Sequence, residues 1–394
     1  MIISNINSGL GNQLFQYAFG RRLAYKRNTE LKLDLTLYEN DNFCTYSLNL
    51  FNINATIATP EEIATVKNYR GGVRKEEHAD IFIPEALNYP DNVWLYGYWI
   101  REEYFTDIAD IIRKEITLKN PLGASARRWR EKILAADYSV SLHVRHGDFA
   151  YNPNYTKRDI FAIVPLDYYY ECVNRLKSEY KNLTLFVFSN NLNWVKENFR
   201  PSVPVEFVEG AGLADVEELY LMSLCKHNII ANSTFSQWGA WLNQNPDKKV
   251  FVPIPSKIVG TNETYRRFSA ERNENSPLDM DKWFRVPFDI NKQPAIKMRP
   301  YFSLLLVVNN DAAMLRETLG SILAQDYKYF ELIIIDNAST DGSGQICRQV
   351  ANANDKVTLI KLWNKIPDGA AYNKAFDLAQ GDYVMFLGTV DNSF

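Results

Sequence analysis

The sequence lacks long hydrophobic runs and clusters of basic residues, and it has few cysteines. No apolar stretch approaches the ~20 residues of a membrane-spanning helix, which argues against a transmembrane protein. The net charge of −3 and the lack of Lys/Arg runs argue against a nucleic-acid partner and against a strongly basic membrane-binding patch. Four dispersed cysteines without metal-ligand spacing indicate reduced core thiols; they are Cys44, Cys172, Cys225 and Cys347.

The chain of 394 residues is nearly half apolar and 13% aromatic, which suits a globular protein with a sizeable core and two or three domains. Met1 leads directly into an apolar stretch, without the basic region and cleavage site of a signal peptide. We therefore expect a cytoplasmic protein, and peripheral association with the inner face of the membrane is compatible with this. The sequon at Asn232 then has no bearing on glycosylation.

Short apolar stretches with strand character alternate with helical patterns, which predicts an α/β protein with parallel sheets. The expected strands cover residues 1–6, 31–35, 93–98, 139–144, 183–188, 205–208, 227–231 and 250–252. We expect one module at residues 1–290, in two halves near 1–130 and 138–290, with the division falling within 120–137. The proline-bearing stretch 286–300 predicts a linker, placed at 291–300, before a new α/β pattern at 301–394.

The stretch SLHVRHGDF at residues 141–149 reads as a buried strand that runs into a polar turn. Residues two apart on a strand share a face, so His143 and Arg145 are expected to project together from its carboxyl end. Ligands of open α/β sheets bind at that end, and a guanidinium can hold a diphosphate bidentately. By itself the pair also fits an arginine on a solvated rim.

Residues 1–28 read as a short strand, a turn with two glycines and a helix. Gly9 and Gly11 permit positive φ and a close approach of another backbone. Asn12 and the free N–H groups of the helix start would then face an anion in the crevice. Taken alone, the pattern favours a merely structural turn.

The segment 227–244 repeats this design, because an apolar strand leads into a helix that begins with polar residues. Such residues either cap the helix or bind phosphate oxygens. Capping explains one of them, and this helix start has four, namely Asn232, Ser233, Thr234 and Ser236.

Five ordered motifs resemble those of the α-1,2-fucosyltransferases. They are GLGNQLFQYAFG, LYGYWIREEYF, HVRHGDF, FVFSNNLNWVKENF and ELYLMSLCKHNIIANSTFSQWGAWLN, and they span about residues 1–290. These enzymes move L-fucose from GDP-fucose to a galactose hydroxyl. The resemblance implies a GT-B-like pair of Rossmann-like domains, with the donor bound mainly by the second, and a reaction that needs no metal or other cofactor.

The resemblance also implies roles for the residues above. Arg145 matches the arginine of the family's His-x-Arg motif and is expected to contact the β-phosphate. Asn12 would approach the same diphosphate from the other half. The other predicted donor-binding positions in these motifs are Gly11, Asn232, Ser233, Thr234 and Ser236.

Three further positions keep two interpretations each. His143 either bonds the guanine or the ribose, or is a satisfied strand histidine. Glu218, where relatives usually have aspartate, either accepts from guanine N1–H and N2–H or is an exposed acid at a helix start. Asp148 either acts as the general base on the acceptor hydroxyl, or orients Arg145 or caps the following turn.

Two positions depart from the family pattern. His146 replaces the second arginine of a usual pair, and an imidazole that is mostly neutral at pH 7 would weaken donor binding. Gln237 replaces the first tryptophan of a usual pair, which would reshape the acceptor pocket. No metal site is expected, because His143 and His146 point to opposite faces of an extended segment and Asp279 and Asp281 fit a helix-capping role.

Residues 301–394 resemble the nucleotide-binding half of the inverting GT-A glycosyltransferases. Their usual signature Asp-Asp-Gly-Ser-Thr-Asp-Gly-Ser reads here as Asp336-Asn-Ala-Ser-Thr-Asp-Gly-Ser343, which implies that Asp336 faces a uracil-type base. Gly388 and Val390 stand where metal-binding aspartates are usual, and the remaining Asp391 would rarely hold Mg²⁺ or Mn²⁺ alone. We expect a partial GT-A domain without activity of its own.

The leading hypothesis is a GDP-fucose-dependent galactoside α-1,2-fucosyltransferase that acts on a surface polysaccharide or glycan precursor. Its partners would be GDP-fucose and a galactoside acceptor. One alternative is a catalytically weak glycan- or nucleotide-binding protein, motivated by His146 and Gln237. Another is a related transferase with a different GDP-sugar donor.

Overall fold

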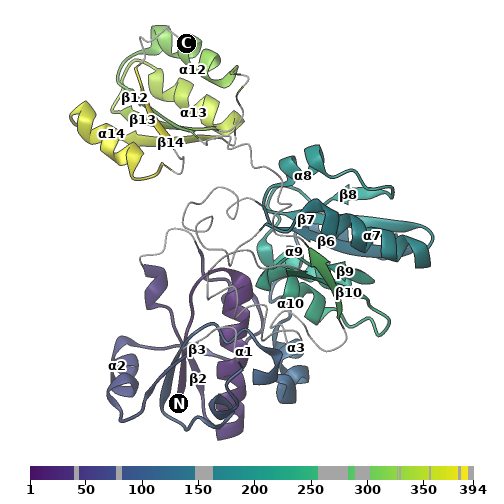
Figure 1. The fold of residues 1–394 in the computed structure, drawn as a ribbon. Coiled ribbons are helices and arrows are strands. Elements are labelled where there is room, and N and C mark those ends of the chain that lie inside the picture. The colour runs from purple at the N-terminus through teal and green to yellow at the C-terminus, as the bar shows by residue number, and fades with distance from the viewer. Residues whose placement is uncertain are drawn as a thin grey trace, which may run out of the picture. The chain divides into compact units, whose positions relative to one another are not determined.

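The computed structural model describes residues 1–39, 44–76, 82–146, 163–255, 283–288, 302–325, 327, 330–354, 356–379 and 383–388. The chain divides into two compact units, Met1–Pro294 and Ala295–Phe394. The first unit holds two sheets and the second holds one, and helices pack against each of them (Figure 1). Within the described part of the chain, no helix combines the length and apolar character needed to cross a membrane.

The first sheet has five parallel strands in the order β3-β2-β1-β5-β4. Its strands and helices are β1 (Ile2–Asn5), α1 (Leu10–Arg27), β2 (Leu31–Asp34), β3 (Thr56–Ile57), α2 (Pro60–Asn68), β4 (Val73–Lys75), β5 (Val93–Tyr96) and α3 (Ala109–Glu115). Short 3-10 helices cover Thr36–Glu39, Leu48–Leu50, Pro84–Asn88, Glu102–Tyr104 and Thr106–Ile108. The apolar residues of α1 recur at helical spacing and are buried, which anchors the helix on the sheet.

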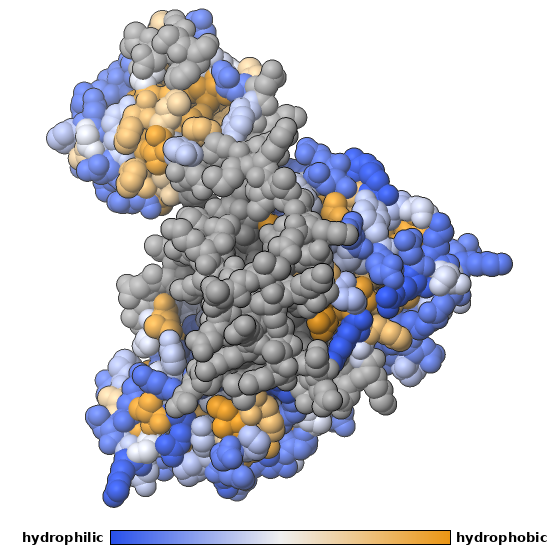
Figure 2. All heavy atoms as spheres, in the orientation of Figure 1, coloured by the Kyte–Doolittle hydropathy of each residue, from blue (hydrophilic) through white to orange (hydrophobic). Residues whose placement is uncertain are grey.

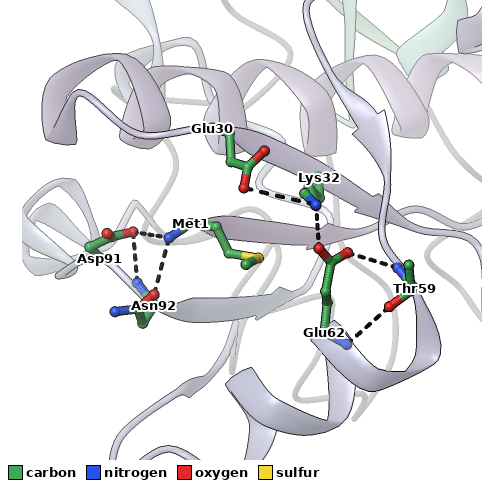
Figure 3. A network of polar contacts seen from close by, with 7 residues as sticks. All are labelled: Met1, Glu30, Lys32, Thr59, Glu62, Asp91 and Asn92. Carbon is green, nitrogen blue, oxygen red and sulfur yellow. Dashed lines mark hydrogen bonds and ion pairs between the residues drawn. The ribbon is translucent and has the colours of Figure 1, made fainter.

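Polar contacts tie the ends of β1 and β2 to neighbouring segments (Figure 3). The terminal ammonium of Met1 donates to Asp91 Oδ1 at 2.6 Å. At the start of α2, Thr59 N–H donates to Glu62 Oε2 (2.9 Å) and Glu62 N–H donates to Thr59 Oγ1 (3.2 Å), which forms a capping box. Lys32 of β2 pairs with the same Glu62 carboxylate, so the helix start is fixed to the sheet.

The second sheet has six parallel strands in the order β11-β10-β9-β6-β7-β8. Its elements are α4 (Ala124–Ala135), β6 (Tyr138–Val144), α7 (Leu166–Glu179), β7 (Leu183–Ser189), α8 (Leu192–Asn198), β8 (Val205–Phe207), α9 (Asp215–Leu224), β9 (His227–Ile229), α10 (Thr234–Leu242), β10 (Val250–Pro255) and β11 (Phe284–Phe288). The strand order is that of a Rossmann fold, and it reverses between β6 and β9.

The predicted fold class is confirmed, because both halves of the first unit are parallel α/β layers. All eight expected strands are present, with ends shifted by a few residues, because each is an apolar run flanked by turn residues. The sequence did not predict β3 and β4, which are short, or β11, which overlaps the proline-bearing stretch from residue 286 that was interpreted as a linker.

The two halves share an apolar core. Phe15 of α1 lies against Trp238 of α10, with ring centroids 4.9 Å apart, and Phe105 stacks on the same indole at 5.4 Å and 13°. Residues of α9 and α10 belong to the buried cluster that also contains residues of β1 and β5. An interface this apolar favours one fixed arrangement of the halves.

The second unit contains a four-stranded parallel sheet in the order β14-β13-β12-β15. Its elements are β12 (Phe302–Val308), α12 (Ala312–Leu323), β13 (Phe330–Asn337), α13 (Ser343–Ala353), β14 (Val357–Leu362), α14 (Asp368–Phe376) and β15 (Tyr383–Leu387). Strand β15 exposes Tyr383, Met385 and Phe386, and apolar side chains gather on the visible surface of this unit (Figure 2).

Candidate functional site

The carboxyl ends of β6 and β9 form the centre of the candidate site. These neighbouring strands lie where the strand order reverses, which is where ligands bind in open α/β sheets. Arg145 directly follows β6, and Asn232 and Ser233 follow β9 after two apolar residues and lead into α10, which begins at Thr234. The fold therefore brings two sequence-predicted motifs to one edge of the second sheet.

The first residues of α1 meet the first residues of α10 in backbone contact. An added Cβ at Gly11 would lie 2.4 Å from Phe235 N and 2.5 Å from the carbonyl carbon of Thr234. A helix start carries partial positive charge and unpaired N–H groups, so two helix starts are directed to the same place. The predicted close approach at Gly11 is thus present, and it is made by the other half of the first unit.

The two glycines, which permit positive φ, do not adopt it in this turn. Gly9 has φ −72°, and the left-handed residue of the turn is Ser8, with φ 64°. Ser8 tolerates this conformation within a turn where its hydroxyl lies 3.0 Å from Asn7 Oδ1. Glycine is therefore required at position 11 by lack of space, and nothing lies within 4 Å of a Cβ added at Gly9.

Asn12 and Thr234 meet across the two halves. The Thr234 hydroxyl donates to Asn12 Oδ1 at 2.9 Å, although the two residues are 222 positions apart in the chain. Both residues were predicted from separate motifs to face one diphosphate. In this structure they hydrogen-bond to each other at the meeting point of the two helix starts.

The other hydroxyls of the segment differ in what they contact. Ser233 is the N-cap of α10, yet its side chain makes no capping hydrogen bond within the described residues. Ser236 is buried, and its Oγ accepts from Ala231 N–H (3.3 Å) and donates to the Ser233 carbonyl (3.2 Å). The Ser236 hydroxyl is therefore engaged by the backbone, and Ser233 and Thr234 are the more available of the predicted hydroxyls.

His143 is the penultimate residue of the buried strand β6, two positions before Arg145. It is 4% exposed, its ring lies 5.8 Å from that of Phe235, and its Nδ1 has no hydrogen-bond partner within the described part of the chain. Burial, together with the nearby charge of Arg145, lowers the pKa of His143 to about 3. The imidazole is therefore neutral at physiological pH, and the interpretation as a satisfied strand histidine does not hold for this Nδ1 atom.

His146 lies beside the site rather than in it. Its ring stacks on Trp194 of α8 at 3.8 Å and 14°, and its N–H donates to Asn190 Oδ1 at 3.1 Å. Burial lowers the pKa of His146 to about 4. The imidazole is therefore neutral at physiological pH, as expected, and does not supply the charge of the arginine that it replaces. Asp148, the candidate general base, lies outside the described residues.

Glu217 and Glu218 are neighbouring acids in the first turn of α9, and they differ in burial and in their contacts. Glu217 is buried and accepts from Gly123 N–H (2.6 Å) and Ala214 N–H (3.2 Å), so its carboxylate joins the starts of α4 and α9. Sequence reasoning missed Glu217, although its position three residues after the N-cap is the capping-box position. Glu218 is half-buried, and desolvation with a smaller contribution from Asp215 raises its pKa to about 7.

The interpretation of Glu218 as an ordinary exposed helix-start acid is therefore wrong, because burial outweighs the stabilising helix dipole. Gln237 and Trp238 are both fully buried in the shared core. Gln237 is thus a buried packing residue of α10, and the expected effect of this replacement on the acceptor pocket stays a prediction.

Among the described residues, no group of three or more His, Cys, Asp or Glu side chains could hold a metal ion. Asp279 and Asp281 lie outside those residues, as do Val390 and Asp391 of the second unit. Asp336 is fully buried and accepts from Ser339 N–H at 2.9 Å, so its carboxylate organises the turn after β13.

Comparisons with known proteins divide the chain in the same way. The family model "Glycosyl transferase family 11" matches residues 75–257, and "Glycosyl transferase family 2" matches residues 303–389. An alpha-1,2-colitosyltransferase of Escherichia coli is 32% identical over 305 residues, which cover 73% of this chain and 99% of the relative. The O-antigen biosynthesis glycosyltransferase WbnK of Escherichia coli is 28% identical over 319 residues, covering 72% and 99%.

Among solved structures, fucosyltransferase NodZ from Bradyrhizobium is similar to this chain with a TM-score of 0.37 and 15% identity, covering 60% of this chain and 91% of that one. The length and identity of the match to the colitosyltransferase are sufficient to assign the family. The chain belongs to glycosyl transferase family 11, and a glycosyl transferase family 2 segment follows this module in the second unit.

Proposed function

We propose that the first unit transfers L-fucose from GDP-fucose to the 2-hydroxyl of a galactose residue in a surface glycan. The observation that carries the proposal is the contact of Asn12 with Thr234, at 2.9 Å, where two helix starts converge. Arg145 follows β6, the strand that pairs with β9 ahead of α10. A pyrophosphate needs N–H and hydroxyl donors together with a cation. All three are available at this one edge of the second sheet.

The chemical step is a direct displacement at the anomeric carbon, with inversion and an oxocarbenium-like transition state. Negative charge grows on the departing GDP, and donors already aimed at the diphosphate stabilise it. Arg145 supplies the cation, while Asn12, Ser233 and Thr234 supply neutral donors. The Asn12–Thr234 hydrogen bond opens when the diphosphate takes its place.

Base recognition falls to Glu218 and His143. A carboxylate can accept from guanine N1–H and N2–H together, and burial increases the strength of such hydrogen bonds. The unpartnered Nδ1 of His143 is a neutral donor or acceptor for the ribose or guanine. Asp148, three residues after Arg145, is the proposed base on the acceptor hydroxyl.

No metal ion takes part in this proposal. Arg145 and two helix starts provide the positive potential that Mg²⁺ supplies in other nucleotide-sugar enzymes. Turnover is therefore expected to persist in excess EDTA. Loss of turnover in EDTA that Mg²⁺ or Mn²⁺ restores would contradict a metal-independent reaction.

The names of two relatives support the proposed acceptor class. One is named for O-antigen biosynthesis and another for α-1,2 transfer of colitose. Both names suit a transferase that builds bacterial surface polysaccharide. We propose the same process for this chain, with a galactose-containing glycan precursor as acceptor.

The test is GDP release from GDP-fucose in the presence of lactose and other galactosides. Arg145→Ala is expected to lower kcat by about 10²–10³-fold, the usual loss when one preorganised donor is removed. Arg130→Ala on α4 removes an exposed arginine that has no role in the proposal and serves as the matched control. Equal activity in the Arg145→Ala and Arg130→Ala variants would overturn the assignment.

A second candidate is a transferase with a different GDP-sugar donor, which the colitosyltransferase relative favours. A panel of GDP-sugars with one acceptor separates the two donors by kcat/KM. Tight GDP binding without turnover on any donor and acceptor would instead support a nucleotide-binding protein, for which the neutral His146 is the motivating observation.

A further inference from the structure

A cavity of about 470 Å³ lies in the first unit at the joint between its halves. Its walls come from the end of α3, from the connection at residues 116–122, from the second half of α9 and from the end of α10. Organic ligands occupy cavities of roughly 300–1,000 Å³, commonly at domain interfaces. The size and position of this cavity therefore suit a small molecule.

The cavity is separate from the candidate pyrophosphate position. Thr234 lies in the first turn of α10, whereas Leu242 lines the cavity from the last turn of the same helix, and the lining along α9 begins at Leu219, directly after Glu218. The nine residues of α10 span about 12 Å at 1.5 Å per residue. A ligand in this cavity would therefore not occupy the pyrophosphate position.

The charge of the cavity is positive. Arg113 is the one charged side chain among the described lining residues, and its guanidinium lies over the Trp241 ring at 4.1 Å. Its carboxylate partner, Asp110, is 3.6 Å away and almost fully exposed, so water screens that pair. Outside the lining, burial and then the Arg113 charge lower the pKa of Lys248 to about 8, while the Glu102 carboxylate, which accepts from Trp241 Nε1–H at 2.7 Å, acts in the opposite direction.

The rest of the lining is amphipathic. Leucine side chains of the 116–122 connection, α9 and α10 supply apolar surface, while Asn120, Ser223 and Gln244 supply hydrogen-bonding groups. Apolar walls with a few polar groups and one fixed cation favour a ligand with an apolar body and an anionic end.

We propose that this cavity is a second binding site, which takes a small amphipathic anion: an organic molecule with an apolar body and one carboxylate, sulfonate or phosphate. Arg113 holds the anionic end, and the leucines of α9 and α10 pack against the apolar body. The site is independent of the function proposed above.

The experiment uses two fluorescent probes that share a ring skeleton, anionic 8-anilinonaphthalene-1-sulfonate and neutral N-phenyl-1-naphthylamine. Each is titrated into the full chain with and without saturating GDP. We expect saturable binding of both probes that GDP does not displace. Arg113→Met is expected to weaken sulfonate binding about tenfold or more, as loss of a charged hydrogen bond predicts, and to leave the neutral probe unchanged.

Blocking variants locate the bound probe. Leu224→Trp fills the cavity from α9, and Gln244→Trp fills it from an exposed position whose replacement leaves the core intact. Both are expected to abolish binding of either probe, while Gln325→Trp, at an exposed position of the second unit, leaves it unchanged. Circular dichroism and GDP binding check the fold of each variant.

Three results would overturn the proposal. Displacement of the sulfonate by GDP would assign it to the nucleotide site, and binding that survives Gln244→Trp would assign it to exposed apolar surface, such as Tyr383 and Phe386 of β15. Equal weakening of the binding of both probes by Arg113→Met would show that the charge of Arg113 does not hold the sulfonate.

Discussion

Gly11 lies where the backbones of the two halves approach each other closely, and its lack of a side chain is a testable requirement. The Cβ of Gly11→Ala would meet the backbone of Thr234 and Phe235, which cannot rotate away as a side chain could. We expect a loss of about 1–3 kcal/mol in the free energy of unfolding, as for other overpacked sites, and weaker GDP binding. Urea denaturation and calorimetric titration measure the two effects.

Gly9→Ala is the matched control for this prediction. Position 9 has open space around an added Cβ and a φ of −72° that alanine adopts readily. The substitution should leave both stability and GDP affinity near those of the natural chain. If Gly9→Ala and Gly11→Ala behaved alike, the contact between the helix starts would not be the cause.

Glu218 predicts a pH dependence of guanine recognition. Its pKa is raised to about 7, so the carboxyl group is protonated below that pH and ionised above it. Only the carboxylate accepts from both guanine donors, so guanosine affinity should rise about tenfold between about pH 6 and pH 8. Guanosine is the suitable probe because it carries no titrating phosphate.

The control for this profile is Glu218→Gln, which keeps one oxygen acceptor and removes the titration. Its guanosine affinity should be flat with pH. A natural chain with a flat profile, or a Gln variant with the same slope, would contradict the proposed role of Glu218.

At this scale, sequence reasoning found residues whose chemistry is explicit in their type. Arg145, Asn12 and Thr234 were identified because a cation and polar groups follow apolar strands. Sequence reasoning failed where the surroundings of a side chain determine its role. Burial raises the pKa of Glu218, and the backbone engages Ser236, and neither effect can be read from the residue type.

At the scale of elements, α10 connects the candidate site to the core that joins the halves. Trp238 is fully buried and contacts the rings of Phe15 and Phe105. Trp238→Ala is expected to lower the free energy of unfolding by about 3–5 kcal/mol, as for other large core residues. Urea denaturation measures the loss, and Leu134→Ala at an exposed position of α4 is the control.

The same substitution should also weaken GDP binding, because α10 carries Thr234 at its first turn. A destabilised variant with unchanged GDP affinity would show that α10 packing and nucleotide binding are independent. The sequence predicted a helix that begins with polar residues in segment 227–244, but it could not tell that this helix packs on residues of the first half, since apolar spacing does not name a partner.

At the scale of the whole molecule, the two compact units predict separate contributions to activity. Asp336 is the penultimate residue of β13 in the second unit, and its carboxylate accepts from Ser339 N–H in the following turn. Asp336→Asn should change kcat and KM for GDP-fucose by less than about twofold, because the residues proposed for transfer all lie in the first unit. Steady-state kinetics of the full chain test this, and a tenfold loss would show that the second unit takes part.

The tandem arrangement was predictable from sequence, because a proline-bearing stretch separates two segments that each show alternating strand and helix patterns. The apolar core that the two halves of the first unit share was not predictable from sequence. It depends on aromatic residues far apart in the chain, such as Phe15, Phe105 and Trp238, whose contacts arise only in the folded molecule.

The central claim is that Asn12 and Arg145, from different halves, act on one pyrophosphate. Calorimetric titration of GDP and GMP into the natural chain, Asn12→Ala and Arg145→Ala tests it most directly, because GMP lacks the β-phosphate. We predict that each variant loses about tenfold or more in GDP affinity and that its preference for GDP over GMP shrinks. If either variant kept the natural preference for GDP over GMP, that residue would not contact the diphosphate and the claim would be wrong.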